Sequence, residues 1–555
     1  MGSVTATPRI LDGVTPWPAE LAHRYVDAGY WRPETLGSLP RAWAARSGSD
    51  LAVVDGRPGG GRVSYTSLNR RVDRTARGLR ALGIAPSDRV VVHLPNTPEF
   101  VVVFFALLRC GAVPVLALPA HRHVEIEHFV GLAEAVAYVI PDRHESFDYR
   151  ELAARLASGA PSLRHVLVAG DPGPFTGLDD LPAGSDDPLP VVDPGDVAVL
   201  LISGGTTGKP KLIPRTHRDY AYNARASAEV CELTASDVYL ACLPIAHNFP
   251  LACPGMLGAF GVGATVVLAP APSPDVGLEL VERERVTVTA LVPPMARMWV
   301  EVAGWDTHDR SSLRLLQVGG AKLDSALARR IPQALGCQVQ QVFGMAEGLL
   351  NYTRLDDSAE LVADTQGRPL SPDDEVRVVD RAGAEVAAGA VGELWTRGPY
   401  TLRGYYRAAE YNAGAFTEDG YYKTGDLVRR LPSGHLVVAG RVKDVINRGG
   451  ENVSSATLEE HLLAHPAIAQ AAVLGLPDES VGERVCAVVT LAEGVERAPK
   501  LREIRAYLAG RGLARFFNPD VFLVREQLPL TAVGKIDKRA LAAELPDGRN
   551  AGADG

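Results

Sequence analysis

The sequence predicts an α/β protein in which helices cover parallel β-sheets. Across residues 50–440, short β-rich runs alternate with helical patterns, as where DRVVVHL precedes TPEFVVVFFALLRCG. The runs AVPVLAL and ATVVLAP are likewise followed by helical segments, HVEIEHFVGLAEA and DVGLELVERERV. This alternation is typical of parallel strands joined by crossover helices. Clusters of Gly and Pro such as GRPGGGR separate the elements.

Length and a change of pattern predict two domains. The 555 residues exceed the size at which a single hydrophobic core stops growing. From Gly392 the pattern changes to short strands with turns, GELWTRG and LVRRLPSGHLVVAGR. Beyond a boundary near Gly440–Lys443, two helices (SSATLEEHLLAH, KLREIRAYLAGRG) and two strands (AAVLGLP, CAVVTL) indicate a small α+β unit. We therefore expect an N-terminal domain at 1–440, a C-terminal domain at 441–545 and a disordered polar tail at 546–555.

Composition argues for a soluble enzyme and against several other classes. Hydrophobic residues make up 46% and charged residues 22%, and the formal net charge of −9 disfavours a nucleic-acid binder. The cysteines contain no C-x-x-C pair, so neither a disulfide framework nor a zinc site is expected. They are Cys110, Cys231, Cys242, Cys253, Cys337 and Cys486.

No targeting or membrane segment is evident. The start, MGSVTATPRILDG, lacks the apolar core of a signal peptide and the Ser or Thr of a myristoylation site. The apolar run Phe100–Leu108 is too short to span a bilayer and indicates a buried element. We expect a cytoplasmic protein without a membrane partner.

The stretch SGGTTGKPK, Ser203–Lys211, has the composition of a phosphate-binding loop. It is not a P-loop, because only three residues separate Gly204 from Gly208 and Pro210 stands where Ser or Thr should follow the lysine. Its glycines and hydroxyls nevertheless suit a polyphosphate. Taken alone, the stretch is also compatible with a flexible turn.

Further motifs extend this pattern along the chain. They are LPIAHNFPLACPG (243–255), LQVGGAKL (316–323), QQVFGMAEGLLNYTRLDD (340–357), YYKTGDLVRR, GRVKDVINRGGENV and PLTAVGKIDKRAL (529–541). In order and spacing, they resemble the adenylate-forming superfamily of acyl-CoA synthetases, peptide-synthetase adenylation domains and luciferases. The resemblance covers nearly the whole chain and implies the adenylate-forming fold, a large N-terminal domain with a small mobile C-terminal domain.

A narrower resemblance concerns the substrate. The segments LDGVTPWPAELAHRYVDAGYW, HNFPLACPG and QVFGMAEGLLNYTRLDD look like those of stand-alone aryl-acid–AMP ligases of siderophore and aryl-capped peptide pathways. That family uses ATP and Mg²⁺ to form an aryl-AMP with release of pyrophosphate. It then passes the acyl group to the phosphopantetheine thiol of an aryl carrier protein, which is the implied partner.

The resemblance implies an ATP site built from several motifs. The residues expected at the phosphates are Ser203, Gly204, Thr206, Thr207, Gly208 and Lys209, with Lys211 nearby. Those expected at the adenine are Gly319, Gly320, Ala321, Gln341, Val342 and Phe343. Glu347 is the expected Mg²⁺ ligand, a hard oxygen for a hard cation. Asp426 and Arg441 are expected at the ribose, although a structural ion pair is the alternative for both.

Catalysis is expected to depend on both domains. Lys535 resembles the lysine that meets the substrate carboxylate and the α-phosphate, and His247 resembles the residue between the acid pocket and that phosphate. A solvated lysine and a hydrogen-bonded core histidine are the alternatives. Lys443 matches the hinge about which the small domain rotates between adenylation and thioester formation. The segment FFNPD at Phe516–Asp520 departs from the family's usual Lys-Ile-Pro or Met-Ile-Pro, which leaves the local contacts of the small domain open.

The expected acid pocket favours salicylate. Asn248 stands where amino-acid-activating relatives carry Asp, and its amide suits an ortho-hydroxyl and a carboxylate rather than an ammonium. Phe249, Cys253 and Leu350, with Gly320, should line the ring. Dihydroxybenzoate enzymes tend to have Tyr, Ser and Val at the first three positions, and salicylate enzymes Phe, Cys and Leu. For Cys253, a simple core cysteine is the alternative.

Three alternative functions stay open. A 2,3-dihydroxybenzoate-AMP ligase would use the same site, and an aryl-CoA ligase would share the first step and use CoA as the thiol. A catalytically silent adenylate-binding scaffold is less compatible with the presence of Lys535, Glu347 and Asp426.

Overall fold

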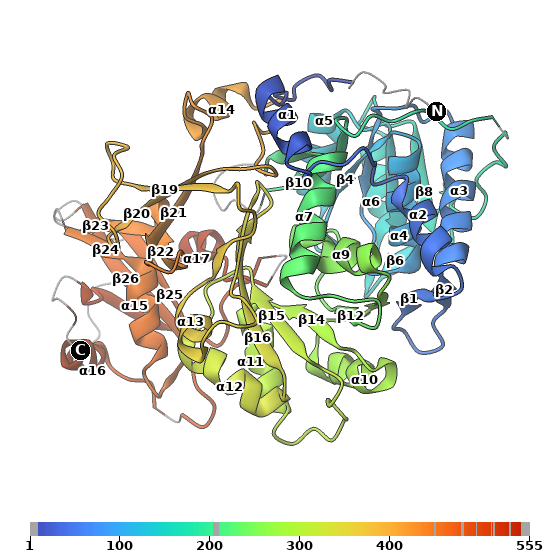
Figure 1. The fold of residues 1–555 in the computed structure, drawn as a ribbon. Coiled ribbons are helices and arrows are strands. Elements are labelled where there is room, and N and C mark those ends of the chain that lie inside the picture. Colours follow the sequence, from blue (N-terminus) through green and yellow to red (C-terminus); the bar gives the residue numbers. More distant parts are fainter. Residues whose placement is uncertain are drawn as a thin grey trace. The chain divides into compact units, whose positions relative to one another are not determined.

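The computed structural model describes residues 9–185, 187–203, 210–448, 451–478, 482–495, 497–511, 513, 517–531 and 534–545 (Figure 1). These residues form two compact units. The first contains residues up to 203, 210–375 and 396–422, and the second contains 376–395 and the residues from 423 onward. The domain boundary expected near Gly440–Lys443 and the hinge expected at Lys443 stay predictions, and the tail at 546–555 lies outside the described residues.

A nine-stranded sheet in the first unit has the order β18-β17-β16-β15-β14-β12-β13-β1-β2. Its strands are β1 (Leu51–Asp55), β2 (Arg62–Ser64), β12 (Val238–Ala241), β13 (Thr265–Leu268), β14 (Val288–Leu291), β15 (Leu315–Gly319), β16 (Gln338–Met345), β17 (Leu349–Tyr352) and β18 (Arg368–Pro369). The strands from β16 to β1 are parallel to their neighbours, whereas β2, β17 and β18 pair antiparallel at the two edges.

A seven-stranded sheet in the same unit has the order β11-β10-β4-β3-β5-β8-β9. Its strands are β3 (Arg89–Val92), β4 (Val113–Leu116), β5 (Ala137–Pro141), β8 (His165–Ala169), β9 (Thr176–Gly177), β10 (Val197–Ile202) and β11 (Leu212–Thr216), and β6 (Arg143–His144) pairs with β7 (Phe147–Asp148) separately. Only β11 is antiparallel to its neighbour within the seven-stranded sheet. The predicted parallel sheets are thus confirmed, and antiparallel edge strands are added.

Helices surround these sheets. They are α1 (Ala19–Asp27), α2 (Leu39–Ser47), α3 (Tyr65–Ala81), α4 (Pro98–Arg109), α5 (His123–Ala133), α6 (Tyr149–Ala157), α7 (His217–Val230), α8 (Asn248–Ala252), α9 (Gly255–Val262), α10 (Pro274–Glu284), α11 (Pro293–Val302), α12 (Ser325–Leu335), α13 (Ala359–Asp364) and α14 (Ala409–Ala415). The apolar run at Phe100–Leu108 is the buried body of α4, as predicted. That helix begins where Thr97 Oγ1 accepts a hydrogen bond from the Phe100 amide, with Pro98 in its first turn.

Apolar side chains of α10, α11 and α12 form one core against the nine-stranded sheet. Trp299 and Ile331 are fully buried in it. A second core lies between the seven-stranded sheet and helices α5 and α6, where Phe129 and Leu152 pack. Each core has an apolar helix face and strands buried on the facing side, which is the arrangement that crossover connections favour.

The second unit holds most of a four-stranded sheet and a five-stranded sheet. The former consists of β19 (Glu375–Val379), β20 (Val391–Arg397), β21 (Tyr422–Arg430) and β22 (Leu436–Arg441). The latter consists of β23 (Val445–Arg448), β24 (Glu451–Ser454), β25 (Ile468–Asp478), β26 (Gly482–Leu491) and β27 (Val521–Val524). The remaining elements are the 3-10 turn η1 (Val442–Asp444) and the helices α15 (Ser455–Leu463), α16 (Leu501–Gly510) and α17 (Lys538–Glu544). The helices and strands predicted after the boundary are confirmed.

The unusual segment around FFNPD has specific contacts in this unit. Asp520 pairs with Arg448, and its Oδ2 accepts a hydrogen bond from the Val485 amide at 2.9 Å. Arg448 also donates to the Asn518 carbonyl. Asp520 therefore connects the segment to β23 through Arg448 and to β26 through Val485. Phe516 lies outside the described residues.

Candidate functional site

The candidate acid pocket lies beyond the carboxyl end of β12, where a loop leads into the short helix α8. His247 caps this helix, and its Nδ1 accepts a hydrogen bond from the Phe249 amide at 3.3 Å. Asn248, Phe249 and Cys253 follow and are all buried. Ligands of α/β sheets commonly bind beyond the carboxyl ends of the strands.

Both ends of the Asn248 amide have partners. Its Oδ1 accepts a hydrogen bond from the Tyr220 hydroxyl at 2.8 Å, and its Nδ2 donates to Cys253 Sγ at 3.4 Å. Tyr220 belongs to α7 and is fully buried. The structure thus brings Asn248 and Cys253 together, as predicted from the motif, and adds Tyr220.

Close backbone approach shapes the wall beside Phe249. A Cβ at Gly319, the last residue of β15, would lie 3.1 Å from the Phe249 ring and 2.7 Å from the Val342 carbonyl oxygen. Glycine is therefore required there. Leu350 lies opposite Gly344 in the β16–β17 pair, where a Cβ at Gly344 would lie 2.3 Å from Leu350 Cδ2.

Burial keeps the Cys253 thiol in its neutral, unreactive form. Loss of hydration raises the pKa of its thiol to about 12, so the neutral thiol dominates at neutral pH. A thiol is a weak hydrogen-bond donor and acceptor. The interpretation made from sequence, that this cysteine is not a reactive thiol, agrees with its environment.

Two further residues hold Leu350 in place. Its amide donates a hydrogen bond to the Tyr400 hydroxyl at 3.1 Å, and that hydroxyl donates to Asp374 Oδ2 at 2.6 Å. Burial raises the pKa of Asp374 to about 7 despite the hydrogen bond from Tyr400. Neither residue belongs to a motif recognised in the sequence.

The base of the phosphate-loop candidate is closed by hydrogen bonds between its two ends. The Ser203 amide donates to the Lys211 carbonyl, and the Lys211 amide donates to Ser203 Oγ, both at 2.9 Å. The Lys211 ammonium lies 3.8 Å from the ring centroid of Tyr411. Residues 204–209 lie outside the described residues, so the expected roles of Gly204, Thr206, Thr207, Gly208 and Lys209 stay predictions.

Glu347 is buried close to the hydroxyl groups of two tyrosines. Its Oε1 accepts a hydrogen bond from the Tyr405 hydroxyl at 2.8 Å, and the hydroxyls of Tyr405 and Tyr422 lie 2.8 Å apart. Burial, with the Glu347 charge second, raises the pKa of Tyr405, which keeps that hydroxyl protonated as a donor. A carboxylate held in this way fits Mg²⁺, which usually takes one or two protein carboxylates and completes its shell with water and phosphate. Within the described ranges, no cluster of three His, Cys, Asp or Glu residues forms a protein-only metal cage.

The adenine candidates differ in exposure. The side chain of Gln341 is buried, donates to the carbonyls of Val362 and Ala363, and accepts from Gln366, so it packs β16 against α13. Val342 is buried and Phe343 is half-buried. Gly320 has a φ of 84°, a value that favours glycine, and Ala321 is exposed.

In the second unit, Asp426 and Arg441 are cross-strand neighbours. Arg441 Nε donates to Asp426 Oδ1 at 2.8 Å in the β21–β22 pair. Burial raises the pKa of Asp426, while Arg441 and then Lys535 oppose the shift. The charge of Lys535 thus acts on the carboxylate expected at the ribose. Lys443 falls in η1, and its side chain is outside the described set.

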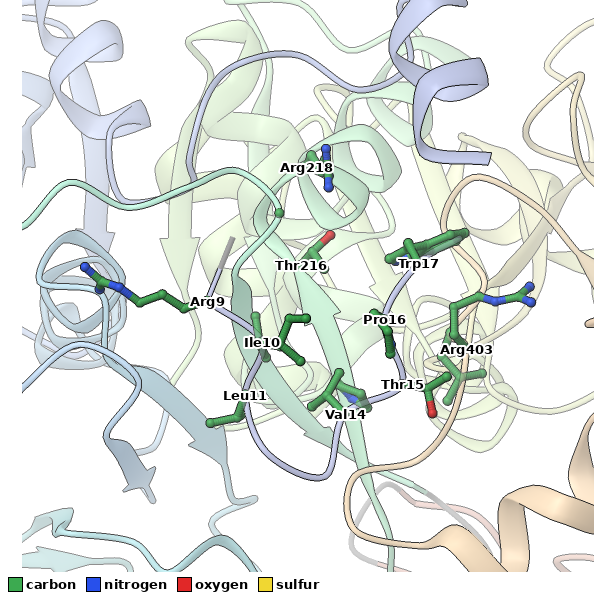
Figure 2. Close-up of a pocket in the computed structure, with 14 residues that line it drawn as sticks. Arg9, Ile10, Leu11, Val14, Thr15, Pro16, Trp17, Thr216, Arg218 and Arg403 are labelled. Carbon is green, nitrogen blue, oxygen red and sulfur yellow. The ribbon is translucent and has the colours of Figure 1, made fainter. Parts of the chain in front are cut away.

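One described cavity lies outside the candidate site. Its volume is about 260 Å³, and it lies where residues 9–17 cross β11 (Figure 2). Its wall includes Trp17, Thr216, Arg218 and Arg403, and none of the residues predicted for the ATP or acid sites. The candidate site is therefore located by the chemistry of the predicted residues and not by this cavity.

Tyr220, Tyr400, Tyr405 and Asp374 are the site residues that sequence reasoning missed. Each reaches its partner across long sequence separations, for example 58 residues between Tyr405 and Glu347. No local spacing carries such a signal.

Comparison with known proteins identifies the family. Residues 40–406 match the family described as AMP-binding enzyme, and residues 457–535 match the AMP-binding enzyme C-terminal domain. The chain belongs to the AMP-binding enzyme family. The resemblance found in the sequence motifs is therefore confirmed.

Full-length relatives of this AMP-binding enzyme include two named ligases. The 2,3-dihydroxybenzoate-AMP ligase of Bacillus subtilis (strain 168) is 52% identical over 538 residues, covering 97% of this chain and 98% of the relative. The salicyl-AMP ligase / salicyl-S-ArCP synthetase of Mycobacterium tuberculosis is 52% identical over 540 residues, covering 96% and 95%. The apo structure of Mycobacterium smegmatis MbtA superposes with a TM-score of 0.75 at 51% identity, covering 97% of this chain and 100% of that one.

Among the described residues of this AMP-binding enzyme, none of the helices has both the length and the apolar character needed to cross a membrane.

Proposed function

We propose that this AMP-binding enzyme activates a hydroxylated aryl acid, preferably salicylate, and transfers it to an aryl carrier protein. A carboxylate oxygen of the acid attacks the α-phosphorus of ATP, the new P–O bond forms, and pyrophosphate leaves. The phosphopantetheine thiolate of the carrier then attacks the acyl carbon, and AMP leaves. We place the enzyme in the cytoplasm, in siderophore or aryl-capped peptide synthesis.

The single observation that carries the choice of acid is the buried hydrogen bond from Asn248 to Cys253, and we propose that Phe249 and Leu350 complete the pocket around it. Overall identity is 52% to a salicylate enzyme and to a dihydroxybenzoate enzyme alike, so it does not separate the two acids. Two features support the proposed preference for salicylate: Cys253 Sγ already accepts a hydrogen bond from Asn248, and a thiol bonds a 3-hydroxyl poorly. A buried hydroxyl without a partner costs about 1–3 kcal/mol.

The remaining residues supply charge. Glu347 would hold Mg²⁺, which neutralises phosphate charge when bound. Lys535 would meet the carboxylate and the α-phosphate, with His247 between the acid and that phosphate. Asp426, with two acceptor oxygens, would bind the ribose hydroxyls, and Arg441 holds that carboxylate at 2.8 Å.

The test uses purified enzyme with ATP, Mg²⁺ and an aryl acid. We expect acid-dependent ATP–pyrophosphate exchange and loading of a phosphopantetheinylated carrier in preference to CoA. Loading of CoA alone would make the protein an aryl-CoA ligase. ATP binding without exchange for any aryl acid would indicate the silent scaffold.

A further inference from the structure

A buried arginine lies between the acid pocket and the turn that carries Glu347. Arg215, in β11, is 1% exposed. Its Nε donates to Asp219 Oδ1 at 2.8 Å, and its Nη1 donates to the Ala346 carbonyl at 3.0 Å. The residue after Ala346 is Glu347. Arg215 is thus bonded directly to the backbone of the candidate magnesium turn.

The same guanidinium contacts the support of the acid pocket. Its Cζ lies 4.7 Å from the ring centroid of Tyr220, whose hydroxyl donates to Asn248 Oδ1. A cation over the ring lies within the range of a cation–π interaction. The interaction polarises the phenol and strengthens its hydroxyl as a donor, which holds the Asn248 amide in one orientation.

That orientation determines what Asn248 offers to a substrate. With Oδ1 accepting from Tyr220, the amide nitrogen is directed toward Cys253, to which it donates one N–H. An amide nitrogen carries two N–H groups, so the second is the one that reads an acceptor oxygen of the acid. Without Tyr220, the amide could rotate and present its oxygen instead.

Asp219 keeps the arginine from moving. Its Oδ2 accepts from the amide and the hydroxyl of Thr216, in the capping box that begins α7. The carboxylate is therefore held by the helix end, and the guanidinium is held by the carboxylate. Among the described residues, Arg215 Nη2 has no hydrogen-bond partner, so the two contacts to Asp219 and Ala346 determine its position.

We infer that Arg215 is a positioning residue that couples the reading of the acid by Asn248 to the setting of the Glu347 turn. The inference rests on the proposed function. One planar guanidinium donates to the Ala346 carbonyl and lies over the Tyr220 ring, so it contacts both parts of the site. A flexible lysine ammonium lacks the fixed fork of donors that holds this group in place. Tyr220 transmits the effect on the acid side, and the Ala346 carbonyl transmits it on the metal side.

Three variants separate the effect of Arg215 on the choice of acid from its effect on Mg²⁺ dependence. Tyr220→Phe removes only the hydroxyl, so the kcat/KM ratio of salicylate to benzoate should fall about fivefold, the scale of one neutral hydrogen bond. Its Mg²⁺ dependence should not change. Arg215→Gln should lower the same ratio and also weaken the binding of Mg²⁺ to the enzyme in the presence of ATP, measured by calorimetry without any aryl acid, by about tenfold. The Mg²⁺ concentration for half-maximal exchange should rise by a similar factor. Arg215→Lys should rescue neither property fully, because lysine lacks the fork.

The matched control is Arg218→Gln, three residues along the same segment. Its guanidinium lies 4.6 Å from the Trp31 ring centroid and lines the separate cavity of Figure 2. Both the acid ratio and the Mg²⁺ dependence should stay at the wild-type values. If Arg215→Gln does not fold, Arg215→Gln/Asp219→Asn removes both charges of the buried pair and should show the same two changes.

The outcomes distinguish this inference from the function on which it rests. If the wild-type enzyme showed no aryl-dependent exchange, both the proposed function and the coupling by Arg215 would be wrong. An active wild type whose acid ratio is unchanged in Tyr220→Phe would overturn the coupling alone. A uniform loss of kcat for all acids in the arginine variants, with unchanged Mg²⁺ dependence, would reduce Arg215 to a structural role and would also overturn it.

Discussion

Cys253 and Leu350 are the residues that should decide which ring substituents the acid pocket accepts. Both are buried, and Leu350 lies against Gly344 in the β16–β17 pair. A serine hydroxyl is a far better hydrogen-bonding group than a thiol, and valine is one methylene shorter than leucine. The preference for salicylate over 2,3-dihydroxybenzoate should therefore change when both residues are substituted together.

We predict that Cys253→Ser with Leu350→Val improves kcat/KM for 2,3-dihydroxybenzoate by about tenfold, the effect of a hydrogen bond of roughly 1.4 kcal/mol. Asn248→Ala should instead harm both acids, since each carries the ortho-hydroxyl. Steady-state exchange with the two acids measures this. No gain for the dihydroxy acid in the double variant would remove these residues from the specificity pocket.

Lys535 should be essential for adenylation and dispensable for binding ATP. In Lys535→Ala, the charge that develops on the α-phosphate loses its counter-charge. Aryl-dependent exchange should vanish, while ATP binding, followed by calorimetry, persists. Lys500→Ala, at an exposed position before α16, is the control and should exchange normally. Near wild-type exchange in Lys535→Ala would refute the assignment.

Asp374 should make stability depend on pH. Its folded pKa of about 7 exceeds its ordinary value of 3.8, so between these pH values the folded state holds a proton that the unfolded state releases. The free energy of unfolding should therefore fall as pH rises from 4 to 7, by up to about 4 kcal/mol. Asp374→Asn should abolish this slope. Denaturant unfolding at pH 5 and pH 8 measures it.

The neighbouring Asp373→Asn is the control for this experiment. Asp373 forms a partly exposed ion pair with Arg24 at 3.1 Å, and such pairs contribute about 0–1 kcal/mol. Its pH slope should match that of the wild type. A slope that persists in Asp374→Asn would show that another group is responsible.

At this scale the sequence identified candidate pocket residues but not the residues that support them. Asn248, Phe249 and Cys253 belong to one short motif, so their spacing alone predicts that they lie close together. Tyr220 and Tyr400 reach Asn248 and Leu350 only through the fold, over 28 and 50 residues respectively. Their role depends on a hydroxyl direction that no local pattern encodes.

At the scale of elements, alternation of short apolar runs predicted β3, α4, β4, α5, β13 and α10 correctly. Their apolar residues repeat with the period of the element that they form. The order of the strands in the sheets could not be predicted from the sequence. The pairing of Val53 in β1 with Val266 in β13 joins segments more than two hundred residues apart, and nothing local specifies it.

The hinge prediction also belongs to this scale. Lys443→Pro should leave adenylation largely intact and abolish thioester transfer, because proline fixes φ near −65° and prevents the rotation. Lys443→Ala, which leaves the backbone free, is the control and should transfer. Exchange and carrier loading are measured on the same preparations. Equal loss of both steps in the proline variant would count against an alternating small domain.

At the scale of the whole molecule, the proposed chemistry draws on both compact units. The acid pocket and Glu347 belong to the first unit, and Lys535, Asp426 and Arg441 belong to the second. Family matches at residues 40–406 and 457–535 cover both. Neither unit alone carries the complete set of residues, so full activity should require the entire chain.

The most direct test of the account is a competition among acids. The enzyme receives ATP, Mg²⁺ and equal concentrations of salicylate, 2,3-dihydroxybenzoate and benzoate, and the aryl-adenylates formed are quantified by mass spectrometry. We predict that salicyl-AMP dominates, because the acid carries the ortho-hydroxyl that Asn248 reads and lacks the 3-hydroxyl that Cys253 serves poorly. A dominant dihydroxybenzoyl-AMP, or as much benzoyl-AMP as salicyl-AMP, would contradict it.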